Sequence, residues 1–422
     1  MARERVILVG VGLKPEAPAM ASSLAELQRL VETAGGEAAG SVSQCLNRYQ
    51  PGTLIGTGKI AEIAALAAAR GASTVIFDRE ISPAQQKNLE AALRRKLIDR
   101  TRLILDIFAK RARTGEGRLQ VELAQLSYML PRLTGAWRGY SQQVGGIGTR
   151  GPGERQLEYE RRHIQYRIKH LKLELERVRS ARLLRRQRRL AVPVPQVALI
   201  GYTNVGKSTL LNRLTAGTAG VYADDKLFAT LDPTARRVRL PEGSWAVVTD
   251  TVGFIRRLPT TLIAAFRATL EEAVMADCLV TVADAASAET AAQQQAVEET
   301  LLDLEAGDLP RVRLFNKSDA IDLRRQRELE AIYPGSIFVS AATGEGMTQA
   351  LEAVQRTLSQ RWLLRELALP AAKAMSYVSE IRRCSQVLSQ VPDGDAVIFR
   401  LRLTPENWDR LQKKLTETKE IA

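Results

Sequence analysis

Short apolar runs alternate with helical patterns over the first part of the chain, up to about residue 108. The runs RVILVGVGL and STVIFD are almost continuously apolar, which is typical of buried strands. Residues 23–34 and 82–95 have helical spacing, and Ser82-Pro83 has the form of an N-cap followed by proline at the first helical position. Alternation of this kind predicts an α/β domain in which helices pack on a sheet.

Heptad spacing replaces this alternation from residue 117 onward. The first apolar stripe consists of Leu119, Leu123, Leu126 and Leu130. The second consists of Ile164, Ile168, Leu171, Leu175 and Val178. Two such stripes on consecutive helices predict an antiparallel helical hairpin with residues 131–153 as its tip.

Two prolines in LAVPVP end the second hairpin helix and mark a linker, after which the α/β alternation returns. The tail combines a strand, DAVIFRLRL, with a final helix that starts at TPENWDR. We therefore predict four parts with an α/β fold overall. They are an α/β domain over 1–115, a basic helical hairpin over 116–192, a second α/β domain over 193–361 and a small α+β domain over 362–422.

Positive charge is concentrated in the hairpin. The chain carries a formal net charge of +14, of which residues 131–189 carry +11. An excess of this size favours a polyanionic partner. The three cysteines are far apart and form no C-x-x-C pair, which is typical of free thiols in a reducing compartment. No apolar run approaches the ~18 residues of a membrane span, and the N-terminus lacks the pattern of a signal peptide.

The segment VALIGYTNVGKSTLLNRL reads as strand, loop and helix, and it fills the pattern G-x-x-x-x-G-K-[ST]. Backbone N–H groups of such a loop bind phosphate oxygens together with the helix N-terminus. We expect Lys207 to reach the β- and γ-phosphates and the Ser208 hydroxyl to bind Mg²⁺. The predicted nucleotide contacts here are Gly201, Tyr202, Thr203, Asn204, Val205, Gly206, Lys207, Ser208 and Thr209.

Two later segments have the form of nucleotide switches. In AVVTDTVG, Asp250 would hold the Mg²⁺ shell through water, and the Gly253 N–H would reach the γ-phosphate. In DKLFATLDPT, Thr230 is the candidate to close on Mg²⁺ and the γ-phosphate, and Thr234 is the alternative. The predicted contacts are Phe228, Ala229, Thr230, Leu231, Asp232, Asp250, Thr251, Val252 and Gly253. Among all these residues we predict Lys207, Thr230 and Gly253 as catalytic, and Ser208, Thr230 and Asp250 as metal ligands.

The segment VRLFNKSD ends in Asn316-Lys317-x-Asp319 and indicates the base. A carboxylate such as that of Asp319 accepts hydrogen bonds from N1–H and N2–H₂ of guanine, whereas adenine would leave it unpaired. The sequence therefore predicts GTP, with Ser340-Ala341 supporting guanine O6. The predicted base contacts are Asn316, Lys317, Ser318, Asp319, Ser340, Ala341 and Ala342.

Two positions in these motifs bear on the rate of hydrolysis. Phe254 stands after Gly253, where Ras-type G proteins have a glutamine that orients the attacking water. Because a phenyl ring cannot hydrogen-bond that water, intrinsic hydrolysis should be slow and a partner should complete the site. Asn204 is a candidate ligand for K⁺, and the alternative is a hydrogen bond that stabilises the loop.

The stretch SQQVGGIGTRGPGE contains G-x-G-x-x-G, but no apolar strand precedes it, so it does not indicate a dinucleotide site. Arginines that meet phosphates and aromatic rings that stack on splayed bases favour an RNA-contacting tip. The alternative is a loop whose rings pack on its own domain. The candidate RNA contacts are Arg132, Trp137, Arg138, Tyr140 and Arg150.

Two other residue sets receive a simpler interpretation. LIGTGKI is interpreted as a turn before a helix, with a second nucleotide site as the alternative. His163 and His170 lie one heptad apart on the basic helix and are interpreted as surface or RNA-facing residues.

Together, these motifs resemble those of the HflX GTPases, in the Obg-HflX group of translation-factor-like G proteins. The matching stretches cover roughly residues 75–260 and are SPAQQKNLE, IDRTRLILDIFAKRARTGEGRLQVELAQL, GGIGTRGPGE, GYTNVGKSTLLNRLT, LFATLDPT and DTVGFIRRLP. The resemblance implies a cytoplasmic, GTP-hydrolysing protein that binds the large ribosomal subunit and dissociates stalled or idle assembled ribosomes. It also implies that the N-terminal domain and hairpin approach the peptidyl-transferase region of ribosomal RNA. We expect a monomer without a stable membrane anchor, at most weakly associated with membranes.

Two other functions stay open at this point. One is a GTPase that acts as an assembly or checkpoint factor for the large ribosomal subunit, and the other is a GTP-regulated RNA chaperone. All of these functions require RNA binding, so composition does not separate them, although the lack of a helicase motif set disfavours the chaperone. A membrane-associated regulator is disfavoured because the sequence has no amphipathic anchor or lipidation motif.

Overall fold

The computed structural model describes residues 3–135, 152–189, 194–215, 228, 234–256, 274–360 and 362–420. The chain divides into two compact units. The first comprises residues 1–176, 222–232 and 252–269, and the second comprises 177–221, 233–251 and 270–422. Two segments from the middle of the nucleotide-binding region thus belong to the same unit as the N-terminal domain.

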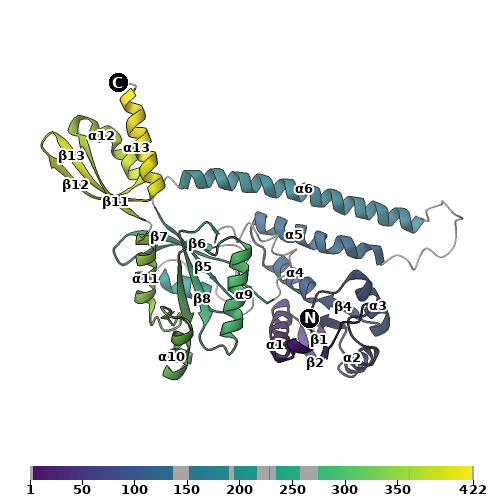
Figure 1. Ribbon diagram of the computed structural model, residues 1–422. Helices are drawn as coiled ribbons and strands as arrows, with labels where there is room; N and C mark the ends of the chain where they lie inside the picture. Colours follow the sequence, from purple (N-terminus) through teal and green to yellow (C-terminus); the bar gives the residue numbers. More distant parts are fainter. Residues whose placement is uncertain are drawn as a thin grey trace. The chain divides into compact units, whose positions relative to one another are not determined.

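A four-stranded parallel sheet of order β2-β1-β3-β4 forms the base of the first unit (Figure 1). Its strands are β1 (Arg5–Leu13), β2 (Glu37–Leu46), β3 (Thr74–Phe77) and β4 (Lys96–Asp99). Its helices are α1 (Ala17–Ala34), α2 (Thr57–Ala69), α3 (Pro83–Leu93) and α4 (Arg100–Arg111), with a short 3₁₀ turn η1 (Lys14–Glu16). This architecture confirms the predicted α/β fold. Helix α1 starts at Ala17 rather than at residue 23, and α3 starts after Ser82, whose hydroxyl accepts the Gln85 N–H.

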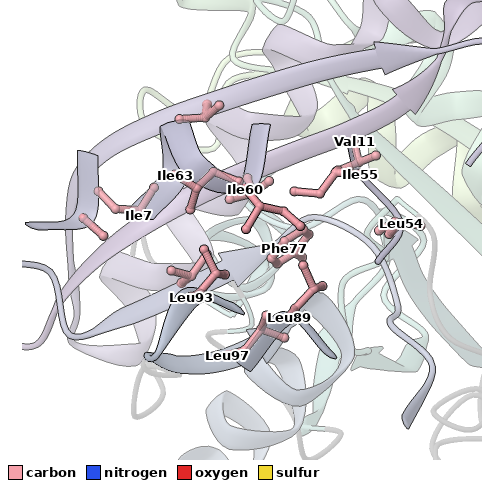
Figure 2. Packing of buried hydrophobic residues seen from close by; sticks show 14 of the residues in the cluster. Ile7, Val11, Leu54, Ile55, Ile60, Ile63, Phe77, Leu89, Leu93 and Leu97 are labelled. Atoms are coloured by element: carbon pink, nitrogen blue, oxygen red, sulfur yellow. The ribbon is translucent and has the colours of Figure 1, made fainter. Parts of the chain in front are cut away.

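One hydrophobic core of this domain lies between the sheet and helices α2 and α3 (Figure 2). Ile7 and Phe77 from the sheet meet Ile63 from α2 and Leu89 from α3, and all four side chains are fully buried. Burial of a side chain of this size stabilises the fold by roughly 1.5–3 kcal/mol. The segment LIGTGKI contributes Leu54 and Ile55 to this core and then leads into α2, as expected of a turn before a helix.

A buried charge cluster lies at the carboxyl edge of the same sheet. The Arg100 guanidinium, at the start of α4, is only 3% exposed and pairs with the carboxylates of Glu26 and Asp78. Its Nη1 atom is 2.6 Å from Asp78 Oδ1, and the Ser23 hydroxyl also donates to Asp78. Charges removed from water need partners of this kind, because an unpaired buried charge is strongly destabilising.

Helices α5 (Gly115–Met129) and α6 (Pro152–Arg189), with the 3₁₀ segment η2 (Leu130–Gly135) after α5, form the predicted helical hairpin (Figure 1). An ion pair joins the two helices, with Arg167 Nε 2.7 Å from Glu122 Oε1. Leu171 in the α6 heptad stripe is fully buried, and the other four stripe residues are half-buried. On α5 the leucine stripe is half-buried, whereas Val121 and Ala124 are buried where α5 packs against α4.

The second unit contains a six-stranded sheet of order β10-β9-β8-β5-β7-β6, parallel except for β6. Its strands are β5 (Gln196–Gly201), β6 (Thr234–Arg239), β7 (Trp245–Asp250), β8 (Cys278–Asp284), β9 (Arg311–Asn316) and β10 (Ile337–Phe338). Its described helices are α7 (Lys207–Leu214), α9 (Thr290–Asp303), η3 (Ser318–Ala320), α10 (Leu323–Ile332) and α11 (Met347–Ser359). Strand β8 is apolar along nearly its whole length because both faces of the sheet are covered.

The tail forms a three-stranded antiparallel sheet of order β11-β13-β12. Its elements are β11 (Leu363–Pro370), α12 (Ala371–Cys384), β12 (Gln386–Asp393), β13 (Ala396–Leu403) and α13 (Pro405–Glu420). Alternate β13 residues Phe399, Leu401 and Leu403 point into a core that α12 and α13 complete. The predicted strand and final helix are therefore present.

Two further expectations can be compared with the described residues. The three cysteines are free thiols; Cys278 and Cys384 are buried and Cys45 is exposed. Among the helices described, none is both long and apolar enough to cross a membrane.

We predict that Arg100→Leu destabilises the first unit by about 3–5 kcal/mol, because it removes the cation that pairs with two buried carboxylates. Urea unfolding followed by circular dichroism measures this loss. The control is Arg324→Leu in α10, which removes a solvent-exposed pair with Glu328. A loss for Arg100→Leu no larger than that of the control would contradict the prediction.

Candidate nucleotide-binding site

The phosphate loop connects buried strand β5 to helix α7, as its sequence predicts. Glycine is needed at both ends of the loop for steric reasons. A Cβ atom at Gly201 would collide with the Val282 carbonyl oxygen in β8, and one at Gly206 would collide with the Asn316 side chain. Gly206 also has a φ of 92°, in the left-handed region that favours glycine. The loop can therefore expose its backbone N–H groups without side chains in the way.

Lys207 is the first residue of α7, and its side chain lies folded back over the loop. Its Nζ atom donates to the carbonyl oxygens of Gly201, at 3.1 Å, and Tyr202, at 2.8 Å. The residue is only 6% exposed, and this burial lowers the pKa of Lys207 to about 8. An ammonium group removed from water is suited to compensation by phosphate anions.

Ser208 and Asp250 form the second part of the phosphate end. Strand β7 pairs in parallel with β5 so that Asp250 lies opposite Leu199, beside the loop. The Ser208 hydroxyl donates to Asp250 Oδ2 at 2.6 Å, and Asp250 is fully buried. Hydroxyl and carboxylate oxygens are the ligands that Mg²⁺ prefers in proteins, usually together with waters and substrate phosphates. The pair therefore fits the predicted Mg²⁺ position, although no group of three or more His, Cys, Asp or Glu within the described ranges could hold a metal by itself.

Two other residues of the phosphate loop have polar groups available for a ligand. The buried Thr203 hydroxyl has no hydrogen-bond partner in the described structure. Asn204 has a φ of 62°, and its side chain makes no hydrogen bond with any residue that the structure describes. The loop-stabilising bond that was the alternative for Asn204 is thus not observed among those residues.

The guanine end of the site is built around the Asn316 side chain. Its Nδ2 atom donates to the Val205 carbonyl oxygen at 2.7 Å, and its Oδ1 accepts the Ala341 N–H at 2.9 Å. This buried amide thus joins the phosphate loop to the Ser340-Ala341 segment. Lys317 has a φ of 65°, and its Nζ atom is 2.6 Å from Asp284 Oδ2.

Asp319, the predicted guanine acceptor, is exposed and makes no hydrogen bond or ion pair with any residue that the structure describes. Its carboxylate is therefore available to a ligand. Ser340 is fully buried, and its hydroxyl accepts the Thr343 N–H at 3.1 Å. This bond fixes the Ser340-Ala341 backbone, including the segment expected to face guanine O6.

The switch segments are described only in part. Ala229, Thr230, Leu231 and Asp232 lie outside the described residues, and their roles stay predictions. Phe228 is buried in the first unit, with its ring edge-on to Phe108 of α4 at 4.6 Å between centroids. Gly253 and Phe254 also belong to this unit, and Phe254 is 2% exposed.

The structure describes one of the five candidate RNA contacts. The Arg132 guanidinium lies over the Tyr128 ring and donates to the Ile81 carbonyl oxygen at 2.7 Å. It also lies 3.3 Å from Asp99 Oδ2 and is only 14% exposed, so it is engaged within the domain rather than presented at the surface. Trp137, Arg138, Tyr140 and Arg150 lie outside the described residues.

Sequence reasoning missed Asp284, which pairs with Lys317. Asp284 ends β8 and lies opposite Asn316 in the parallel register of β8 and β9. A polar residue at the carboxyl end of a strand next to the Asn-Lys-x-Asp strand is the signal that could have identified it. The pair holds the Lys317 side chain beside the predicted base position.

The carboxyl edge of one parallel sheet thus carries a phosphate end and a guanine end, an arrangement that defines the class of P-loop GTPases. Family models for GTP-binding GTPase N-terminal, GTP-binding GTPase Middle Region and 50S ribosome-binding GTPase match residues 21–109, 111–189 and 196–317. A GTPase HflX of Caldanaerobacter subterraneus subsp. tengcongensis is 43% identical over 410 residues, which are 97% of this chain and 93% of that protein. GTPase HflX of Escherichia coli (strain K12) is 42% identical over 394 residues, 93% of this chain and 92% of its own. The chain belongs to the HflX family of GTPases.

Solved structures provide a more distant comparison. A GTP-binding protein from the archaeon Sulfolobus solfataricus in complex with GDP has 23% sequence identity and a TM-score of 0.43. The match covers 84% of this chain and 99% of that one.

We predict that GTP binding is accompanied by proton uptake on Lys207. Because burial lowers its pKa to about 8 and phosphates would raise it again, binding above that pH must bring a proton onto the amine. The affinity should then fall by up to about tenfold per pH unit. Calorimetry in buffers of different ionisation enthalpy, between about pH 7 and 9, measures the proton. Lys59→Met, far from the phosphate loop in sequence, should leave this uptake intact, and binding without proton uptake would refute the assignment.

We predict that Asp319→Asn lowers the GTP affinity by about 100-fold or more, because an amide cannot accept both guanine donors. Xanthosine triphosphate has a carbonyl in place of the guanine 2-amino group, so its affinity should rise in the same variant. Competition binding with a fluorescent nucleotide measures both. The matched control is Glu330→Gln, an exposed acid on α10. Unchanged discrimination between the two nucleotides would exclude Asp319 as the base contact.

Proposed function

We propose that this GTPase binds the large ribosomal subunit in its GTP-bound state and dissociates stalled or idle assembled ribosomes, with hydrolysis driving its release. In this proposal Lys207 and the N-terminus of α7 hold the phosphates. Ser208, Thr230 and Asp250 hold Mg²⁺, which neutralises phosphate charge. Coordination of K⁺ by Asn204 belongs to the same proposal.

The observation that carries the proposal is the basic hairpin attached to a GTP site. Residues 154–189, most of α6, contain 13 lysine and arginine residues against 5 acidic ones. Such a helix is suited to a nucleic-acid backbone, since each neutralised phosphate releases counterions. The family model that matches residues 196–317 is described as a 50S ribosome-binding GTPase, which supports the large subunit as the partner. Trp137, Arg138, Tyr140 and Arg150 at the predicted tip are the proposed RNA contacts.

The division into units supports a link between nucleotide state and ribosome binding. Phe228 and Gly253 come from the two segments predicted to respond to the γ-phosphate, and both belong to the unit that contains α5 and the first part of α6, up to Glu176. Within this unit Arg256 Nη1 donates to the Ser22 hydroxyl of α1 at 2.8 Å. A nucleotide that orders these segments would thereby favour one arrangement of the hairpin, provided that it binds one state more tightly.

The buried Phe254 side chain supports a role for the partner in hydrolysis. This residue is apolar and 2% exposed, so it cannot orient an attacking water in place of glutamine. Completion of a G-protein site by a partner can raise the rate by about 10³–10⁵. We propose that the large subunit is this partner.

We predict that the protein with a non-hydrolysable GTP analogue separates vacant assembled ribosomes into subunits and sediments with the large one. GDP should not support this effect, because the switch segments would lack γ-phosphate contacts. Sucrose-gradient sedimentation measures it. Lys207→Ala is the control for nucleotide binding.

Deletion of residues 136–151 should abolish separation and leave the basal GTP hydrolysis rate unchanged. If assembled ribosomes stay intact and the protein binds only free large subunits, the assembly-factor function replaces the one proposed. If the tip deletion still separates ribosomes, the tip is not the element that acts on them.

A further inference from the structure

The outward face of α6 carries a short tandem repeat that neither the nucleotide site nor the hairpin seam uses. The sequences YERRH and YRIKH, residues 159–163 and 166–170, share the form tyrosine, two residues, cation and histidine. They begin one heptad apart, so corresponding residues lie on the same side of the helix, about 10 Å apart along its axis.

The aromatic residues of this repeat are exposed to solvent. Tyr159 is 72% exposed and Tyr166 is 70% exposed, and they are the exposed ones among the tyrosines that the structure describes. Each tyrosine ring lies beside the next histidine ring, Tyr159–His163 at 6.4 Å and 17°, and Tyr166–His170 at 6.5 Å and 28°. With Leu173, 54% exposed, these residues form a continuous row that we call the outer stripe.

The helical hairpin does not need the outer stripe for its own packing. The seam residues, of which Leu171 is fully buried, lie on the opposite side of α6. A helix face that only contacts solvent can consist of small or charged residues. It does not require a repeated pair of exposed aromatic rings. A single exposed tyrosine could arise by chance. Two five-residue segments of the same form, one heptad apart, are harder to explain in this way.

The charge around the outer stripe indicates which kind of molecule would bind there. Arg162 and Lys169 flank it at the same position in the two repeats, and both are exposed. Arg162 pairs with Glu158 at 2.7 Å, whereas Lys169 has no ion pair with a described residue. A second copy of this helix would bring like charges together, which disfavours self-association. The exposed rings favour a partner with unpaired bases that can stack, and the flanking cations favour an anionic partner. Single-stranded RNA has both properties.

We propose that the outer stripe is a binding surface for single-stranded or looped RNA, with Tyr159 and Tyr166 each stacking on an unpaired base and Arg162 and Lys169 meeting the flanking phosphates. This inference rests on the proposed function, since it names the kind of ribosomal RNA element that α6 would contact. It assigns a second RNA-contacting surface, distinct from the hairpin tip.

The test uses the full chain and a short fluorescein-labelled single-stranded RNA, followed by fluorescence anisotropy. Tyr159→Ala with Tyr166→Ala should weaken binding about tenfold or more, because stacking on each base is lost. Tyr159→Phe with Tyr166→Phe keeps the rings and should bind like the unchanged chain. Leu302→Ala removes an equally exposed apolar side chain on α9 and should have no effect. The same sequence as a duplex should show little difference among the variants.

The salt dependence separates the stacking residues from the cations. Arg162→Gln with Lys169→Gln should reduce the slope of log affinity against log salt by about 1.4, whereas the tyrosine changes should leave the slope unaltered. Crosslinking of a 4-thiouridine probe, read by mass spectrometry, should yield adducts at Tyr159 or Tyr166. Circular dichroism of each variant confirms that the helix content is retained.

Three outcomes would overturn the inference. One is equal RNA affinity for the unchanged chain and the alanine variant together with crosslinks found only elsewhere. Another is the same loss in the phenylalanine variant. The third is a dimer that the alanine changes convert to a monomer, which would assign the stripe to protein contact. Failure of the unchanged chain to bind the large subunit would instead refute the proposed function, and this readout needs no stripe variant.

Discussion

The buried Asn316 amide is the interaction on which the nucleotide site depends most. It donates to the Val205 carbonyl oxygen and accepts the Ala341 N–H, so one side chain fixes the distance between the phosphate loop and the segment predicted to face guanine. Neither backbone group has an equivalent partner in the sheet, and leaving a buried polar group unpaired costs about 1–3 kcal/mol. The same residue also explains the glycine at 206, since any larger side chain would collide with it.

Parallel register brings the rest of the site to the same edge. Leu199 lies opposite Asp250, Gly201 opposite Val282, and Asp284 opposite Asn316. Four strands therefore end close together, and each contributes one polar group or loop to the predicted nucleotide site. The N-terminal domain has the same kind of edge, but there Arg100 pairs with Glu26 and Asp78 inside the protein. One edge is thus suited to an external anion, whereas the cation at the other edge is already paired inside the protein.

Much of this arrangement follows from local sequence. The phosphate loop, the Asn-Lys-x-Asp strand and the hairpin seam depend on residues close together in the chain, and each was predictable from spacing. The pairing of Asp284 with Lys317 and the internal contacts of Arg132 could not be predicted in this way. Each joins two elements that are distant in sequence, and spacing along the chain does not show which elements meet. The sequence also did not show that Phe228 and Phe254 belong to the same unit as the N-terminal domain. The predicted domains are consecutive ranges of the chain, whereas this unit combines three separate ranges. Helix α1 was predicted too short because its first turn contains alanine and proline rather than a regular apolar stripe.

In the proposed function the chain binds phosphate in two physically different ways. In the GTPase domain one buried lysine, a helix N-terminus and directed backbone groups act at short range, where salt screens little. On α6 the many lysine and arginine residues would act together in the proposed function, and their effect would depend on counterion release. The first arrangement would select one ligand by geometry, and the second would attract any nucleic-acid backbone without reading its sequence. Specificity for an RNA element must therefore come from groups that recognise bases, and arginine and lysine content alone cannot supply it. If α6 contacts RNA as proposed, raised ionic strength should accordingly weaken those contacts while leaving the nucleotide in its site.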